Sequence, residues 1–121
     1  MASRHPSLDG RTFAAEAEVS GGDVGPATVF RYSERPDGTI HADYAGGTIR
    51  IGRLVGVREG DALRFRYVQL REDGTTASGR CTSVVVALPD GRLAMDEAWA
   101  WESEPGTGTS RVVEISTRRS P

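Results

Sequence analysis

The stretch ALRFRYVQLREDGTTASGRCTSVVVALPDGRLAMDEAWAWE, residues 62–102, decides the fold class. Apolar and polar side chains alternate along most of it, which is the period of a β-strand. Glu72-Asp73-Gly74 and Pro89-Asp90-Gly91 interrupt the alternation, and each is typical of a three-residue hairpin loop that closes on a left-handed glycine. The stretch therefore predicts three antiparallel strands joined by two tight hairpins.

Similar turn motifs continue in both directions along the chain. Turn signals recur about every ten residues, as in sandwiches and barrels; among them, Pro36-Asp37-Gly38 resembles the two loops above and Gly46-Gly47 fits a two-residue turn. No segment of useful length has the period of a helix. The expected strands cover residues 12–19, 27–34, 39–45, 48–58, 62–71, 75–87, 92–102 and 109–117.

Short loops favour pairing between strands that follow one another in the chain. Eight such strands close naturally into an antiparallel up-and-down β-barrel, and closure removes the exposed edges. The same strands would also fit a small sandwich. With 121 residues, we expect a single all-β barrel domain over 1–121, with flexible tails at 1–10 and 117–121.

Charge and composition exclude several classes of function. The formal net charge is −2 and the charges are interspersed, which argues against a nucleic-acid partner. The chain has no lysine, so Schiff-base chemistry on lysine is excluded. Cys81 stands alone, and His5 and His41 are the only histidines. We therefore expect no disulfide, no metal site and no cofactor.

The sequence begins without the apolar run of a signal peptide, and nowhere do 18 apolar residues follow one another. We therefore expect a cytoplasmic protein without a membrane partner.

The strand at 92–102 gives the clearest assignment of faces. Leu93, Met95, Trp99 and Trp101 share one face, and the same alternation places Glu97 among them. A carboxyl on an inward face must find a cationic or hydroxyl partner or keep its proton. Glu97 is therefore the candidate catalytic residue, although a structural hydrogen bond or ion pair would also explain it.

The neighbouring strands leave two registers open. Three-residue loops place Cys81, with Ala77, Gly79, Ser83 and Val85, inside the barrel and Arg80 outside. Two-residue loops would turn Arg80 inward, toward Tyr67 and the tryptophans. We favour the first register, because Pro-Asp-Gly is typical of the longer loop and small residues then face large ones.

The strands at 39–45 and 48–58 are less clear. Ile40, Ala42, Tyr44, Ile49, Ile51 and Val55 would form one face, and His41, Asp43, Arg50, Gly52 and Leu54 the other. A turn at Gly46-Gly47 places Asp43 opposite Arg50, where an ion pair would help to set the register.

Several motifs carry a resemblance that covers nearly the whole chain: residues 8–13, 44–47, 52–56 and 65–67, Gly79-Arg80-Cys81, residues 88–93, and Glu97-Ala98-Trp99-Ala100-Trp101. In these motifs the chain resembles a family of small bacterial proteins often labelled N-acetylglutamate synthase. The resemblance implies a lipocalin-like or avidin-like barrel of the calycin type. The sequence departs from the family at Asp96, where a histidine is expected, and from Ser103 onward.

The synthase activity itself is disfavoured by the residues. Acetyl-CoA phosphates are normally held by a glycine-rich loop that leads into a helix N-terminus, and here the glycines lie at turns of an all-β chain.

Three functional classes follow. The first is a barrel that binds a small, partly apolar molecule through Tyr44, Tyr67, Gln69, Trp99, Trp101 and, in the inward register, Arg80, with Glu97 as polar anchor. The second is a cofactor-independent cyclase or isomerase with Glu97 as acid or base. The third is a filled structural barrel that acts through a homodimer interface. A Tyr, Arg or Gln close to Glu97 across a void would favour the enzyme.

Overall fold

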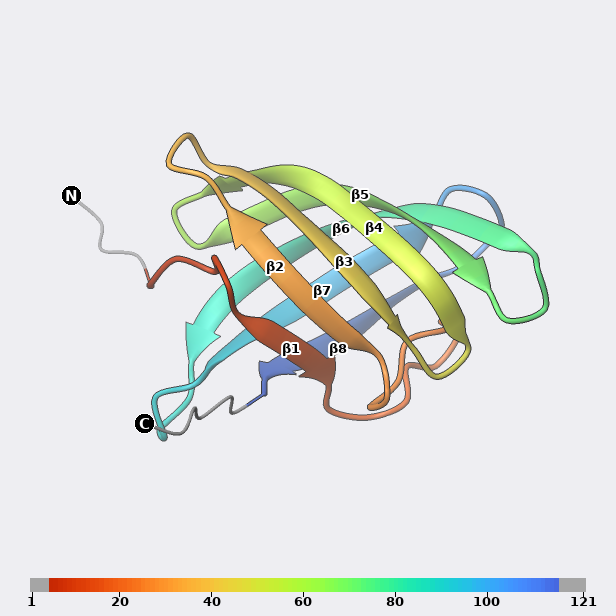
Figure 1. Ribbon diagram of the computed structural model, residues 1–121, viewed down its shortest axis with the longest axis horizontal. Coiled ribbons are helices and arrows are strands. Elements are labelled where there is room, and N and C mark those ends of the chain that lie inside the picture. The colour runs from red at the N-terminus through yellow and green to blue at the C-terminus, as the bar shows by residue number, and fades with distance from the viewer. Residues whose placement is uncertain (1–4, 116–121) are drawn as a thin grey trace.

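The structure, a computed structural model, describes residues 5–115. Eight antiparallel strands pair in sequence order, and β8 returns to β1, so the sheet closes into a barrel (Figure 1). The strands are β1 (Thr12–Ala15), β2 (Val29–Glu34), β3 (Thr39–Gly46), β4 (Ile49–Glu59), β5 (Ala62–Arg71), β6 (Thr76–Ala87), β7 (Leu93–Trp101) and β8 (Thr107–Glu114). The eight-stranded up-and-down barrel is confirmed and the sandwich is excluded; the end of the last expected strand, 116–117, lies outside the described residues.

Three hairpin loops have the geometry that their shared Asp-Gly motif predicts. Gly38, Gly74 and Gly91 all adopt positive φ angles close to 90°, which a residue without a Cβ atom reaches at no steric cost. In each loop the aspartate before the glycine accepts a hydrogen bond from the backbone two residues further on. The loops at 72–74 and 89–91 set the register that places Gly79 and Cys81 opposite Tyr67 and Trp99, respectively.

The turn between β3 and β4 differs from the prediction by one residue. Gly46 pairs with Ile49, so the two-residue turn is Gly47-Thr48. The pairing register shifts between Tyr44 and Gly46 on β3, and again between Ile49 and Ile51 where β4 pairs with β5. As a result Asp43 lies opposite Arg53, and the expected pairing with Arg50 is wrong. The irregularity also turns Ile51 and Val55 to the outer surface, where they are 43% and 61% exposed, while Leu54 is buried in the core.

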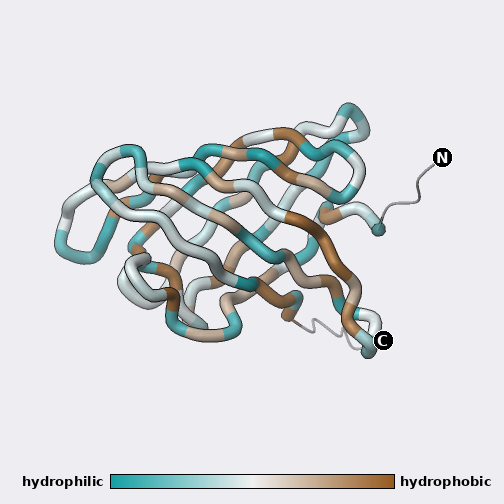
Figure 2. The backbone as a smooth tube through the Cα atoms, turned by 180° about the vertical axis from the view of Figure 1, so that it is seen from behind, coloured by the Kyte–Doolittle hydropathy of each residue, from teal (hydrophilic) through white to brown (hydrophobic). Residues whose placement is uncertain are grey.

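Buried and exposed residues alternate along most strands, and hydrophobic and hydrophilic segments alternate along the backbone tube in Figure 2. The interior of one end is filled by large apolar residues that are almost completely buried: Phe13, Ile40, Leu63, Val85, Leu93, Met95 and Val112. The described part of the chain has no helix that is long and apolar enough to cross a membrane.

The segment before β1 seals this filled end. We expected residues 1–10 to be a flexible tail; instead, Leu8 is fully buried, while residues 1–4 lie outside the described part. The guanidinium of Arg58, also completely buried, donates to the backbone oxygens of His5 and Pro6 and forms ion pairs with Glu34 and Asp61. The N-terminal segment therefore belongs to the folded barrel.

Candidate functional site

A cavity lies inside the other half of the barrel, and aromatic side chains form most of its wall. Its volume is about 50 Å³, enough for about four water molecules. Trp99 and Trp101 from β7 meet edge to face with ring centroids 5.7 Å apart, and Tyr67 meets Trp101 at 5.8 Å. On the opposite side Phe30 stacks on Tyr44 at 4.6 Å. Phe65, Leu54 and Val24 complete the apolar lining.

A glycine lies directly opposite each of three of these rings on a neighbouring strand. Tyr44 faces Gly52, Tyr67 faces Gly79 and Trp99 faces Gly108. A Cβ atom at any of these glycines would lie only 2.4 Å from an atom of the facing aromatic side chain. The rings therefore lie flat across the adjacent strands, and this arrangement leaves space near the barrel axis.

Glu97 is the acidic group in the deeper part of the wall. Ser83 on β6 and Ser110 on β8 donate hydrogen bonds to its two carboxyl oxygens, at 3.3 and 3.1 Å. The residue as a whole is partly exposed, and it lines the cavity. Burial raises the pKa of Glu97 to about 7, although the two serine hydrogen bonds act in the opposite direction. The carboxyl therefore gains or loses a proton near neutral pH.

Cys81 also lines the cavity, but its thiol is not activated. Burial, together with the nearby Glu97, raises the pKa of Cys81 well above its usual range. A thiol in such surroundings stays protonated and is a poor nucleophile. Burial likewise raises the pKa of the Tyr44 and Tyr67 hydroxyls, so both remain neutral hydrogen-bonding groups.

The mouth of the barrel is covered by the loop between β1 and β2, residues 16–28 (Figure 1). Val19, Gly22, Asp23 and Val24 of this loop form part of the cavity wall. Trp101 donates its indole N–H to the oxygen of Gly21 at 3.1 Å. The sequence predicted strand over 12–19, but β1 ends at Ala15 and the following residues form this cover instead.

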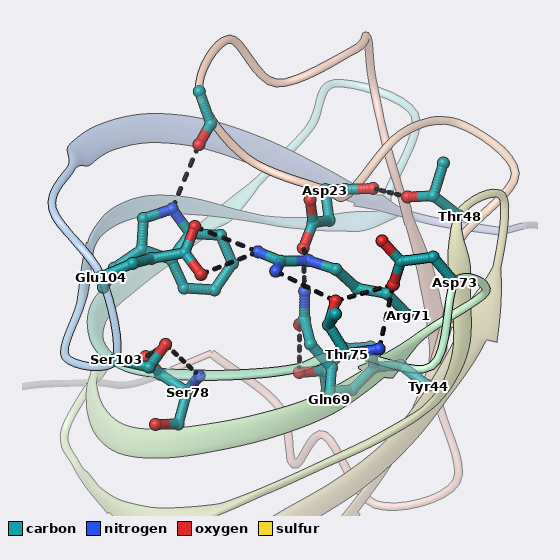
Figure 3. A network of polar contacts seen from close by, with 12 residues as sticks. Asp23, Tyr44, Thr48, Gln69, Arg71, Asp73, Thr75, Ser78, Ser103 and Glu104 are labelled. Carbon is teal, nitrogen blue, oxygen red and sulfur yellow. Dashed lines mark hydrogen bonds and ion pairs between the residues drawn. The ribbon is translucent and has the colours of Figure 1, made fainter.

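A polar network fixes the cover to the strand ends (Figure 3). Tyr44 donates to the Oε1 atom of Gln69 at 2.8 Å, and Gln69 donates through Nε2 to Asp23 Oδ2 at 2.8 Å. The Nε of Arg71 donates to the same oxygen at 2.7 Å. The other side of the Arg71 guanidinium forms an ion pair with Glu104. The guanidinium carbon, Cζ, lies 5.5 Å from the centre of the Trp101 ring.

The structure brings most of the residues singled out from the sequence to one place. Glu97, Tyr44, Tyr67, Gln69, Trp99 and Trp101 all line the cavity. Arg80 does not: it lies on the outer face opposite Arg66, with its side chain 63% exposed and 3.8 Å from Glu102. The favoured register is therefore confirmed, and the inward position of Arg80, on which its candidate binding role depended, is not realised.

Sequence reasoning missed Asp23 and Arg71 as members of the site. Arg71 is the last residue of β5, and its backbone N–H donates to Thr75 across the hairpin to β6. Alternation along a strand does not indicate where the side chain of its last residue points, so the contact of Arg71 with the mouth was not predicted. Asp23 lies in a loop whose path is set by tertiary contacts rather than by local periodicity. Among residues 5–115, no three His, Cys, Asp or Glu side chains are grouped so that they could hold a metal ion.

The fold and this site define a small closed β-barrel with an aromatic-lined chamber below a loop-covered mouth. A family model described as avidin-like protein matches residues 6–115, and the chain belongs to that family. This membership confirms the avidin-like barrel that the sequence resemblance implied. A search of curated proteins found no match.

Proposed function

We propose that the protein binds a small, partly apolar molecule inside its barrel, with the aromatic rings as contact surface and Glu97 as the inner polar anchor. The observation that carries the proposal is the unfilled chamber itself, in which six aromatic side chains and one buried carboxyl meet: Phe30, Tyr44, Phe65, Tyr67, Trp99 and Trp101 around Glu97. A barrel whose role was only structural would gain stability by filling that space.

The anchor sets the chemistry of the ligand end that lies deepest. Both oxygens of Glu97 accept bonds from serines, and each carboxylate oxygen has a further lone pair for a ligand. A hydroxyl or a protonated amine on the ligand supplies the matching donor. The cavity is too small for a molecule of many atoms while the loop at 16–28 is in place, so larger ligands require the loop to move.

An acid–base enzyme is the second candidate, because a pKa of about 7 at Glu97 suits proton transfer near neutral pH. The contacts of Glu97 favour binding instead. Its hydrogen-bond partners are two serines from adjacent strands, which hold the carboxyl in place, whereas Tyr67 donates to the backbone oxygen of Ala100.

Benzyl alcohol and toluene form a matched pair of probes that differ in one hydroxyl donor. We expect benzyl alcohol to bind more tightly at pH 8 and to change the fluorescence of Trp99 and Trp101. Glu97→Gln removes the charge and preserves the shape, and should weaken benzyl alcohol by about 1–3 kcal/mol while leaving toluene unchanged. Calorimetric or fluorescence titration measures both affinities.

Asp96→Asn is the control, because Asp96 neighbours Glu97 in the chain but pairs with Arg111 on the outer surface. It should leave both probe affinities unchanged. If neither probe binds the wild-type protein, the chamber is not a binding site and the filled structural barrel becomes the better description. Turnover of a bound molecule that Glu97→Gln abolishes without loss of affinity would establish the enzyme.

A further inference from the structure

We propose that the chamber is selective for organic cations. It takes the protonated amine of a small, partly apolar molecule, with the Glu97 carboxylate as the counter-ion and the faces of aromatic rings around the ammonium group. The inference rests on the proposed function and deepens it, because it chooses the charged donor over the neutral one. It follows from the charges and the ring faces that line the chamber.

The first observation is that Glu97 has no cationic partner. Its carboxyl oxygens accept bonds from two neutral serine hydroxyls, and within residues 5–115 no arginine or histidine lines the chamber. The filled end of the barrel differs, because the buried guanidinium of Arg58 forms ion pairs with both Glu34 and Asp61. A buried charge is normally paired in this way. The position beside Glu97 is therefore open to a cation that a ligand supplies.

The second observation is that the mouth adds no surplus positive charge. Asp23, the other acid of the chamber wall, forms an ion pair with Arg71 at 2.7 Å. The same guanidinium also pairs with Glu104, so one cation faces two carboxylates there. The negative charge of an ionised Glu97 is thus not cancelled from the mouth. A cation inside the chamber would be stabilised by this field, and an anion would be repelled.

The third observation is the orientation of the rings. Tyr44 and Trp99 lie flat across the glycines opposite them, so each ring covers a strand with one face and turns the other toward the chamber. Trp101 meets both Trp99 and Tyr67 at 64°, so the faces point in different directions. An aromatic face carries negative potential and attracts a cation within about 6 Å of its centre. A volume of about 50 Å³ accepts an ammonium group.

Binding of the cation exchanges it for a proton. Because the pKa of Glu97 is about 7, the empty chamber holds a neutral carboxyl at pH 6. An incoming ammonium group pairs with the carboxylate, and the carboxyl proton is released to solvent. Four other titratable groups face Glu97, and burial raises the pKa of each, so they stay neutral: Tyr32 on β2, Tyr44 on β3, Tyr67 on β5 and Cys81 on β6. The nearby charged groups are Asp23, paired with Arg71, and Asp96, paired with Arg111 on the outer surface.

The test compares benzylamine, a cation at pH 8, with benzyl alcohol, which has almost the same shape and no charge. Calorimetric titration at constant ionic strength measures both affinities. We expect the wild-type protein to bind benzylamine at least about tenfold more tightly at pH 8, because a hydrogen bond between two charged groups is stronger than one to a neutral donor. Glu97→Gln should abolish this preference, since the amine then loses its counter-ion.

The pH dependence tests the same point in the wild-type protein without a substitution. With a pKa of about 7, the carboxylate form of Glu97 makes up about a tenth of the protein at pH 6 and about nine-tenths at pH 8. Benzylamine should therefore bind about tenfold more weakly at pH 6. Titration at pH 6 in two buffers of different ionisation enthalpy should show that about one proton is released for each benzylamine bound.

Asp96→Asn is the matched control, because it removes a carboxylate from the same strand on the outer surface. It should keep the preference for benzylamine at pH 8, whereas Glu97→Gln should lose it. Circular dichroism checks that both variants are folded.

Three results would overturn the inference: benzylamine that binds no more tightly than benzyl alcohol at pH 8, a preference that survives in folded Glu97→Gln, or binding of benzylamine at pH 6 without proton release. The comparison of benzyl alcohol with toluene judges the binding function separately. A chamber that binds these neutral probes and rejects benzylamine refutes the cation selectivity alone, and a chamber that binds none of the three refutes the binding function as well.

Discussion

Glu97 shows how a single residue links stability to pH in this protein. Its pKa is about 7 in the folded chain and 4.5 in the ordinary state of the group, so between these values the folded protein holds a proton that the unfolded chain releases. The stabilising contribution is complete below pH 4.5 and is lost as the pH rises through 7. The full difference between the two pKa values corresponds to about 3 kcal/mol in the free energy of unfolding.

The first prediction concerns this window. Glu97→Gln cannot titrate, so the free energy of unfolding of the wild-type protein should fall by up to about 3 kcal/mol relative to the variant between pH 4.5 and 7.5. Urea denaturation at several pH values measures the difference. A difference that stays constant over this range would mean that Glu97 titrates normally and is not desolvated.

At the residue scale, the sequence predicted which side chains face inward wherever the alternation is regular. It placed Glu97, Trp99 and Trp101 on one face because β7 has no irregularity. The favoured register also placed the small Gly79 opposite the strand of Tyr67, as observed. It did not predict that Gly52 lies opposite Tyr44 or that Gly108 lies opposite Trp99, because the loops that join those strands did not define the register. Six of the proposed site residues were therefore found, while the reason for the open chamber was not.

At the scale of elements, hairpin chemistry predicted most strand boundaries to within one or two residues. The largest exception is β1, whose alternation continues through Glu16-Ala17-Glu18-Val19 although the strand ends at Ala15. Local pattern could not distinguish a strand from a segment that folds over the mouth. The predicted position of the β3–β4 turn was wrong for a related reason, since Gly46-Gly47 and Gly47-Thr48 both allow a two-residue turn.

The second prediction concerns the segment that seals the filled end. Arg58→Ala leaves Glu34 and Asp61 without their shared cation and leaves two N-terminal carbonyls without a donor. We expect a loss of about 3–5 kcal/mol in the free energy of unfolding, because the removed charge is completely buried. Urea denaturation measures the loss.

Arg64→Ala is the matched control, because Arg64 on the adjacent strand forms an exposed ion pair with Glu59. It should change the free energy of unfolding by less than about 1 kcal/mol. Equal effects of the two substitutions would show that the buried network adds no more than a surface pair.

At the scale of the whole molecule, one of the two strands that close the barrel, β1, is short. β1 contains four residues, whereas both β5 and β6 contain ten or more. Fewer ladder hydrogen bonds hold β1 to β2 and β8 than hold the central strands to each other. The barrel should therefore open first along β1.

The third prediction concerns the short pairing of β1 with β2 and β8. Native-state hydrogen exchange should show that amides of β1 exchange through an opening of lower free energy than amides of β5 and β6. Nuclear magnetic resonance in low, increasing urea concentrations resolves the two groups. Identical opening free energies at all concentrations would show that the barrel opens only as a whole.

The pairing of β1 with β8 also determines what happens during synthesis. β1 can complete its pairing only after β8 has been made, because β8 is its second neighbour in the closed sheet and begins at Thr107. At about 5–20 residues per second, the ribosome needs on the order of ten seconds to produce the rest of the chain. Throughout that interval one edge of β1 and each newly emerged strand can pair with another nascent chain, so crowded polysomes are the setting in which this protein is most prone to misassociate.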